Sequence, residues 1–151
     1  MKYFEDYRVG EESMLSAYTV TADEIVAFAK QYDPQYFHLD PEAAKRSIFG
    51  GLVASGWHVC AILMRMLVEE LQRDQAAGLG SPGVDSCRWL KPVRPGDRLS
   101  GRGIVLDAWR SKSKPYGFVR RRFDLSNQHG EIVASLVGLS MFAVQPDATE
   151  S

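Results

Sequence analysis

The stretch from residue 57 to residue 71 constrains the fold of this chain more than any other. It reads W-H-V-C-A-I-L-M-R-M-L-V-E-E-L, a run that predicts a helix with apolar side chains on nearly every side. Such a helix lacks the polar face of an ordinary surface helix. Arg65 interrupts the apolar run short of the roughly 20 residues that a membrane span needs. We therefore expect the rest of the chain to wrap around this helix.

Strand-like segments supply the expected wrapping. Four of them follow the helix, at residues 84–90, 98–109, 118–125 and 132–144, and another precedes it at 14–20. Residues 74–83 combine three glycines with a proline and predict a loop. A sheet curled around a central helix is the simplest cover, so the expected fold class is α+β. We expect one domain over residues 1–145 and a flexible tail over 146–151.

Composition narrows the class of protein. A net charge of -1 provides no positive electrostatic potential that would attract nucleic acid. We expect no membrane partner either. The first residues lack the apolar segment of a signal peptide, so the expected location is the cytoplasm. In that compartment Cys60 and Cys87 are expected to remain reduced core residues rather than to form a bridge.

A carboxylate and an imidazole stand five residues apart, at Asp33 and His38. A helix predicted to begin after Thr21 ends at Asp33, because Pro34 disfavours helical geometry in the residue before it. His38 falls in the short irregular link before the next helix, which Asp40 is expected to cap. Rigid supports on both sides of a short link suit a pair of groups that transfers a proton.

Each of these residues also has a purely structural interpretation. Asp33 is also suited to ending a helix, and His38 to a buried, hydrogen-bonded position in the loop. Asp40 is expected to be only a helix cap, and no metal site is expected, because no further ligands follow at recognisable spacing. His58 is expected to be a satisfied core histidine. The arginines at 120–122 alternate faces on a strand, so we expect them to lie at a solvent-exposed edge of the sheet. One or two of them are available to contact a coenzyme A phosphate.

Three segments together resemble the MaoC-like dehydratases, a family that includes the R-specific enoyl-CoA hydratases. They are D-P-Q-Y-F-H at 33–38, F-G-G-L-V-A-S-G at 49–56 and W-L-K-P-V-R-P-G-D-R-L at 89–99. The likeness covers nearly the whole chain, and the ordered combination is far more specific than the acid–histidine pair alone. It implies a hot-dog fold, with an antiparallel sheet around the long helix and edge-to-edge dimers. It also implies hydration of a 2-enoyl-CoA thioester, or the reverse dehydration, without any cofactor beyond the thioester substrate.

The chemistry of hydration fits the residues independently. Adding water beside a thioester needs a base, an acid and donors for the developing enolate oxygen. Asp33 and His38 can share one water and supply the first two, in either assignment. The start of the central helix offers unpaired backbone N–H groups, and Gly56 leaves the backbone there open to a substrate carbonyl. The resemblance implies that the Gly56 N–H is the oxyanion donor, with Ser55 beside it in the thioester-binding set.

The acid–histidine segment departs from the usual D-x-N-P-x-H of characterised family members. Gln35 is expected to supply the amide in place of the missing asparagine. The bulky Tyr36 and Phe37, together with Trp57, predict a narrow aromatic pocket for a short acyl chain, branched or oxygenated, rather than a long fatty one. The alternative is that Tyr36 and Phe37 only pack beneath the loop.

Two other functions stay open at this point. A hot-dog thioesterase would use the same fold, but the acids on the central helix, Glu69 and Glu70, lie at its far end. A non-catalytic acyl-thioester-binding or subunit-pairing domain would use Asp33 and His38 only as scaffold. For all three functions we expect at least a homodimer, because the apolar helix needs more cover than one sheet supplies and an open sheet edge invites pairing.

Overall fold

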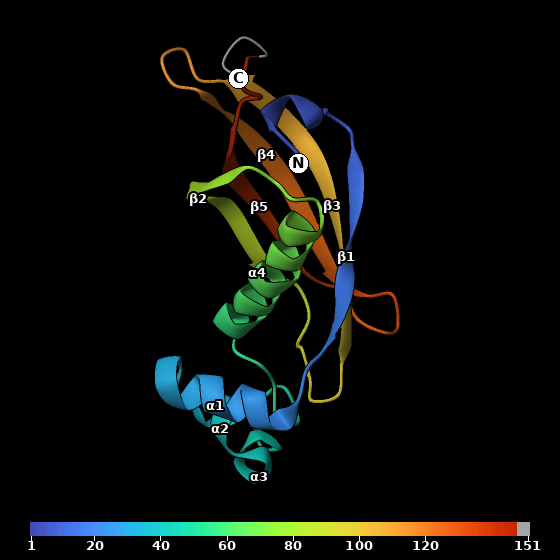
Figure 1. Cartoon of the computed structure of the whole chain (residues 1–151). Coiled ribbons are helices and arrows are strands. Elements are labelled where there is room, and N and C mark those ends of the chain that lie inside the picture. The colour runs from blue at the N-terminus through green and yellow to red at the C-terminus, as the bar shows by residue number, and fades with distance from the viewer. Residues whose placement is uncertain (148–151) are drawn as a thin grey trace.

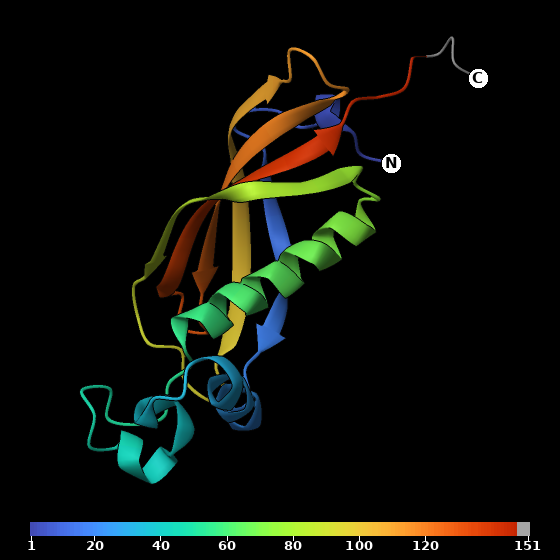
Figure 2. The same ribbon diagram turned by 90° about the vertical axis from the view of Figure 1, so that its left-hand side faces the viewer.

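In the computed structural model, which describes residues 1–147, a single sheet curls around one face of a long helix. This helix, α4 (Gly56–Arg73), runs along the concave side of the sheet (Figures 1 and 2). Three shorter helices form a cap at its N-terminal end: α1 (Ala22–Tyr32), α2 (Tyr36–Leu39) and α3 (Pro41–Ala44). The expected flexible tail falls, for residues 148–151, outside the described residues.

All strand pairings in the sheet are antiparallel, with the order β1-β3-β4-β5-β2. The strands are β1 (Glu12–Thr19), β2 (Gly78–Trp89), β3 (Arg98–Arg110), β4 (Tyr116–Ser126) and β5 (Ile132–Ala143), and a short 3-10 helix, η1 (Phe4–Asp6), precedes them. The last three strands begin and end within two residues of their expected bounds. The α+β class and the hot-dog arrangement are therefore confirmed.

The strand β2 corrects the expectation of a loop over residues 74–83. It begins at Gly78, and its register with β5 shifts three times before Ser86. Gly80 and Gly83 have φ angles of 110° and 156°, which glycine adopts at little cost. Because β2 lies at the sheet edge, Pro82 and the bulges are tolerated there. Signals that usually mark a loop mark a bulged edge strand in this chain.

The sheet covers only one side of α4. Its buried residues include Val59, Ile62 and Met66, whereas Trp57 and Met64 are 64% and 55% exposed. Most of β2 is exposed as well. In a single chain, the face of α4 that carries Trp57 and Met64 therefore stays uncovered.

An ion pair lies in the core beside the far half of α4. Arg121 Nη1 is 2.8 Å from Glu70 Oε1, and the two side chains are 4% and 2% exposed. The guanidinium also lies over the rings of Tyr7 and Phe123. Arg121 belongs to the inward-facing alternation of β4, so the expectation of a solvated edge is wrong for this residue. Its neighbour Arg120 pairs with two surface aspartates.

The two cysteines are free thiols that lie between α4 and β2. Their Sγ atoms are 3.3 Å apart. Burial raises the pKa of the Cys87 thiol to about 11, and the hydrogen bond with Cys60 adds to the rise. The Cys87 thiol is therefore protonated at neutral pH.

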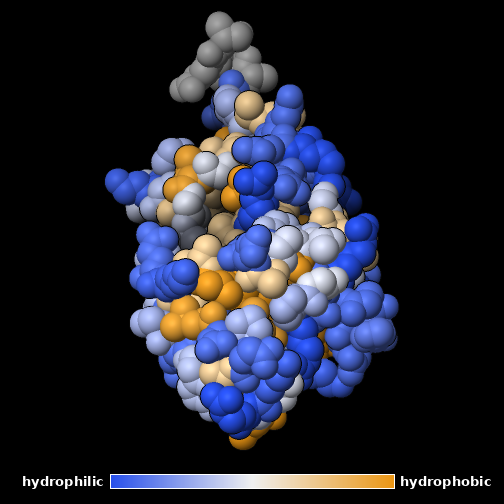
Figure 3. Space-filling view, turned by 90° about the horizontal axis from the view of Figure 1, so that it is seen from below, coloured by the Kyte–Doolittle hydropathy of each residue, from blue (hydrophilic) through white to orange (hydrophobic). Residues whose placement is uncertain are grey.

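No helix within residues 1–147 is long and apolar enough to span a membrane. The cap end of the molecule is seen face-on in Figure 3, where hydrophobic residues gather in a patch among polar ones. Exposed apolar side chains on the cap include Tyr36 and Ile48, which are 51% and 96% exposed.

Candidate active site

The helix α1 places Asp33 through signals that act at its two ends. The Thr21 side chain accepts a hydrogen bond from Glu24 N at 3.2 Å, and the Glu24 carboxylate accepts one from Thr21 N, so the predicted capping box is confirmed. The helix ends at Tyr32, and Asp33 caps its C-terminus by donating its N–H to Ala29 O at 2.9 Å. The sequence therefore sets where this carboxylate leaves the helix.

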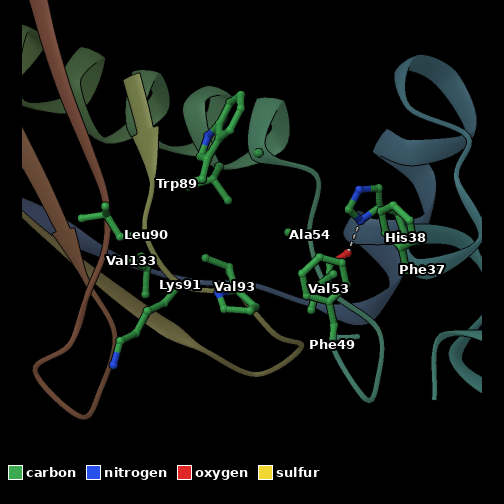
Figure 4. A pocket seen from close by; sticks show the side chains of 13 residues that line it. Phe37, His38, Phe49, Val53, Ala54, Trp89, Leu90, Lys91, Val93 and Val133 are labelled. Atoms are coloured by element: carbon green, nitrogen blue, oxygen red, sulfur yellow. Dashed lines mark hydrogen bonds between the residues drawn. The ribbon is translucent and has the colours of Figure 1, made fainter. Parts of the chain in front are cut away.

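His38 lies in a helical turn rather than in the irregular link that we expected. The four-residue α2 holds it, and only 6% of its surface is exposed. Its Nδ1 is 2.6 Å from Val53 O (Figure 4). Because a carbonyl oxygen only accepts, Nδ1 must carry a proton. The other nitrogen, Nε2, then faces Asp33 Oδ2 at 3.3 Å and is a free proton acceptor in the neutral imidazole.

Hydrogen bonds keep the Asp33 carboxyl ionised. Burial raises its pKa, but hydrogen bonds from Gln35 and Ser55, together with the His38 charge, outweigh burial, so the net pKa lies below the usual range. The Gln35 amide is 2.6 Å from Asp33 Oδ1, so Gln35 supplies the amide contact that we expected of it. A carboxylate that remains charged beside Nε2 stabilises an imidazolium at His38.

The start of α4 lies against an aromatic ring. Ser55 is fully buried and caps the helix, with its Oγ 3.3 Å from Trp57 N. Gly56 is the first helical residue, so its N–H has no partner within the helix. A Cβ at Gly56 would lie 2.3 Å from Cε2 of Trp89. Glycine is therefore required here because the indole packs directly on the backbone.

A cavity of about 370 Å³ connects these elements. Its walls come from the cap and the segment that joins it to α4, the first turn of α4, residues 89–93 and Val133 of β5. His38 lies on one side and Lys91 on the other (Figure 4). Apart from these two, the side chains that line it are apolar. His38 is the member of the acid–histidine pair that lines the cavity. The space suits a small acyl group next to an imidazole.

The aromatic residues of the cavity differ from those expected. Phe37 lines it, but Tyr36 and Trp57 lie outside and are 51% and 64% exposed. Neighbouring residues on their helices take the inward positions. Phe49 and Trp89 supply the other aromatic walls. Trp89 was missed because its role depends on β2 reaching the start of α4, although it opens one of the family-like motifs.

Asp40 has the structural role expected of it. Its Oδ1 accepts hydrogen bonds from Glu42 N at 3.0 Å and Ala43 N at 3.3 Å, with Pro41 at the first position of α3. Within the described residues, no group of three or more His, Cys, Asp or Glu side chains is placed to hold a metal ion.

Comparison with known proteins identifies the relatives of this chain. A family model described as a MaoC like domain matches residues 7–121. The uncharacterized protein YdeM of Bacillus subtilis is 33% identical over 105 residues, which cover 68% of this chain and 72% of YdeM. The mesaconyl-CoA hydratase of Cereibacter sphaeroides is 29% identical over 143 residues, which cover 90% of this chain but only 39% of that protein.

A solved structure is similar over nearly its full length. The MaoC-like dehydratase from Rhodospirillum rubrum has a TM-score of 0.86 and 40% sequence identity, and the match covers 95% of this chain and 98% of that one. The likeness therefore extends from the cap through the whole sheet.

Proposed function

The chain belongs to the MaoC-like dehydratase family, and on this premise we propose that it hydrates a 2-enoyl-CoA thioester or dehydrates the corresponding 3-hydroxyacyl-CoA. One observation carries the proposal. His38 Nε2 and Asp33 Oδ2 are 3.3 Å apart, and His38 lines an apolar cavity that also contains Gly56, at the start of α4. The base, the charge partner and the donor all come from the chain, so the reaction needs no cofactor beyond the thioester itself.

The tautomer of His38 supports a specific sequence of proton transfers. In the hydration direction Nε2 takes a proton from water while the water oxygen bonds to the β carbon of the substrate. The electron pair of the double bond moves toward the thioester carbonyl, and the proton on Nε2 then passes to the α carbon. Asp33 accepts a hydrogen bond from the second O–H of the water, which stays on the β carbon as the product hydroxyl, and its charge stabilises the transient imidazolium. One molecule of water is added, and the neutral imidazole returns.

The start of α4 supplies the site for the developing negative charge. The unpaired N–H of Gly56 donates to the thioester oxygen, and the positive end of an 18-residue helix dipole adds to the stabilisation. Ser55 supports both groups, because it caps this helix and its hydroxyl also lowers the pKa of Asp33.

The positions of the carboxylates on α4 argue against the thioesterase alternative. Glu69 pairs with Arg65 on the surface, and Glu70 is buried against Arg121. Neither lines the cavity, so neither is available to a substrate there.

A spectrophotometric assay tests the proposed function. Purified protein is mixed with enoyl-CoA thioesters of four to twelve acyl carbons, and absorbance of the conjugated thioester is followed together with free thiol. Hydration removes the absorbance without releasing thiol, and the cavity volume favours the shortest chains. Release of thiol would instead identify a thioesterase, and no change with any substrate would identify a binding module.

We also propose that the protein is at least a homodimer in the cytoplasm. The exposed face of α4 carries Trp57 and Met64, and the edge strand β2 is exposed along most of its length. Both features are costly to leave open to water, and free thiols fit a reducing compartment. Light scattering at micromolar concentration should give at least twice the mass of 16.9 kDa; a stable monomer would contradict the proposal.

A further inference from the structure

A second acid–imidazole pair lies beside the first, and the proposed proton transfers do not use it. His58 Nε2 on α4 is 3.1 Å from Glu24 Oε1 on α1, and His58 is 6% exposed. The same carboxylate oxygen accepts from the Tyr18 hydroxyl on β1 at 2.9 Å. The other oxygen accepts from the backbone N–H and the hydroxyl of Thr21. One carboxylate therefore joins β1, α1 and α4.

The imidazole of His58 contacts α1 at a second point. Its ring stacks on Phe28, with ring centroids 4.9 Å apart and an interplanar angle of 12°. Phe28 lies four residues after Glu24, so both contacts fall on the same side of α1. His58 thus fixes both the position and the rotation of α1 on α4.

These contacts connect the two halves of the candidate site. His58 lies two residues after Gly56, the proposed oxyanion donor, while Glu24 and Asp33 lie at opposite ends of α1. The geometry points to His58 as a positioning residue whose hydrogen bond to Glu24 holds the Asp33 and His38 pair in place relative to the Gly56 N–H. This inference rests on the proposed function, and it assigns a role to a residue that does not touch the reacting atoms.

The protonation state of His58 fits this role. Burial lowers its pKa and the charge of His38 lowers it further, while the facing Glu24 raises it; the net pKa is below the ordinary value. The neutral ring carries its one proton on Nε2, because that nitrogen faces a carboxylate. Within residues 1–147, Nδ1 is buried and has no hydrogen-bond partner, so a second proton there would be a buried donor with no acceptor among these residues. These contacts therefore suit the neutral form of His58.

Two substitutions separate the hydrogen bond from the packing. His58→Gln keeps an amide donor within reach of Glu24, whereas His58→Leu keeps apolar volume against Phe28 and loses the donor. Misplacement by about 1 Å costs up to ~100-fold in rate, so we expect His58→Leu to lower kcat by ~10-fold or more with little change in KM. His58→Gln should stay within about 3-fold of the wild-type kcat.

Histidine NMR tests the inference without any substrate. The chain has three histidines, and His129, exposed in a hairpin tip, is the internal control. We expect His58 to be an Nε2–H tautomer with a pKa below the ordinary histidine value of about 6.5. His58→Leu should shift or broaden the His38 resonances, and His58→Gln should leave them in place.

The outcomes that would overturn the inference differ from those that would overturn the proposed function. An Nδ1–H tautomer at His58, unaltered His38 resonances in His58→Leu, or equal loss of kcat in both variants would overturn the positioning role. Inactivity of the wild-type protein toward every enoyl thioester would overturn the proposed function, while the NMR comparison still decides whether His58 positions His38. If His58→Leu does not fold, Glu24→Gln and Tyr18→Phe alter the same contacts from the other side and should shift His38 in the same way.

Discussion

Two acid–base pairs lie at opposite ends of α4, and they differ in whether a proton can move. The Glu70–Arg121 pair is almost fully buried, at 2.8 Å, and a guanidinium does not release its proton in proteins. The Asp33–His38 pair has a longer separation of 3.3 Å, an Asp33 side chain that is 18% exposed, and an imidazole that lines a cavity. Similar charges thus stabilise the core at one end of the helix and are suited to proton transfer at the other. The difference is that His38 can exchange a proton and lines a cavity, whereas Arg121 keeps its proton and is buried.

The largest effect in this comparison is expected from breaking the buried pair. Arg121→Leu leaves the Glu70 carboxylate in the core without its partner, which costs about 3–5 kcal/mol of unfolding free energy. Arg65→Leu is the matched control, because it removes an exposed pair on the same helix, 3.0 Å from Glu69, worth about 0.3–0.5 kcal/mol. Urea unfolding measures both. Equal losses in the two variants would show that burial does not separate the pairs.

Changes to the Asp33–His38 pair should lower the reaction rate more than they lower the stability of the fold. Asp33→Asn and His38→Ala should each lower turnover by ~100-fold or more, which corresponds to about 2.7 kcal/mol in the barrier. The unfolding free energy should change far less than in Arg121→Leu, because Asp33 lies at a helix end. The substitution His129→Ala at the exposed hairpin tip should leave turnover unchanged. Retention of most activity by either site variant contradicts the assignment.

A third change tests how the indole of Trp89 constrains the start of α4. Gly56→Ala places a Cβ 2.3 Å from that ring, and overpacking of this kind costs about 1–3 kcal/mol. We expect lower stability and lower turnover together, because the same backbone carries the proposed oxyanion donor. Trp89→Ala in the Gly56→Ala background should recover the lost stability. If the double variant is as unstable as the single one, contact with the indole is not the reason for glycine.

The smallest effect concerns the dependence of stability on pH. Because the pKa of His58 is lowered in the folded chain, the unfolded chain binds more protons between that value and the ordinary one near 6.5. The contribution to stability is complete above about pH 6.5 and is lost as pH falls through this window. Urea unfolding of the wild type and of His58→Gln at about pH 7.5 and about pH 5.5 should show a smaller decrease in the variant. A larger decrease in His58→Gln would mean that His58 is not buried in its neutral form.

The parts of the site that local signals determine could be predicted from the sequence. Thr21 with Glu24 determines where α1 begins and Pro34 where it ends, so the placement of Asp33 at the end of α1 was predictable. The capping of the next helix by Asp40 was predictable in the same way. The five-residue spacing then brought His38 close to Asp33. Such contacts need only the geometry of a few neighbouring residues.

Contacts between distant segments could not be predicted in this way. Trp89 meets Gly56 only because a bulged edge strand reaches the start of α4, and the glycines and proline of that strand also fit a loop. Arg121 and Glu70 are 51 residues apart in the chain, and strand alternation does not reveal which face curls inward. Because α4 is apolar on nearly every side, its periodicity did not show that Trp57 lies on the exposed face.

The buried pair between α4 and β4 also limits how this sequence can diverge. Two apolar residues at positions 70 and 121 would fill the core as well as the ion pair does. Replacing only one of the two residues, however, leaves the other charge buried and unpaired. The cost is a large part of the roughly 5–15 kcal/mol by which a domain is usually stable. A lineage that carries the pair therefore keeps it because the single-substitution intermediates are unstable, although the final apolar pair would be stable. In descendants of such a lineage, positions 70 and 121 should be found changed together or not at all.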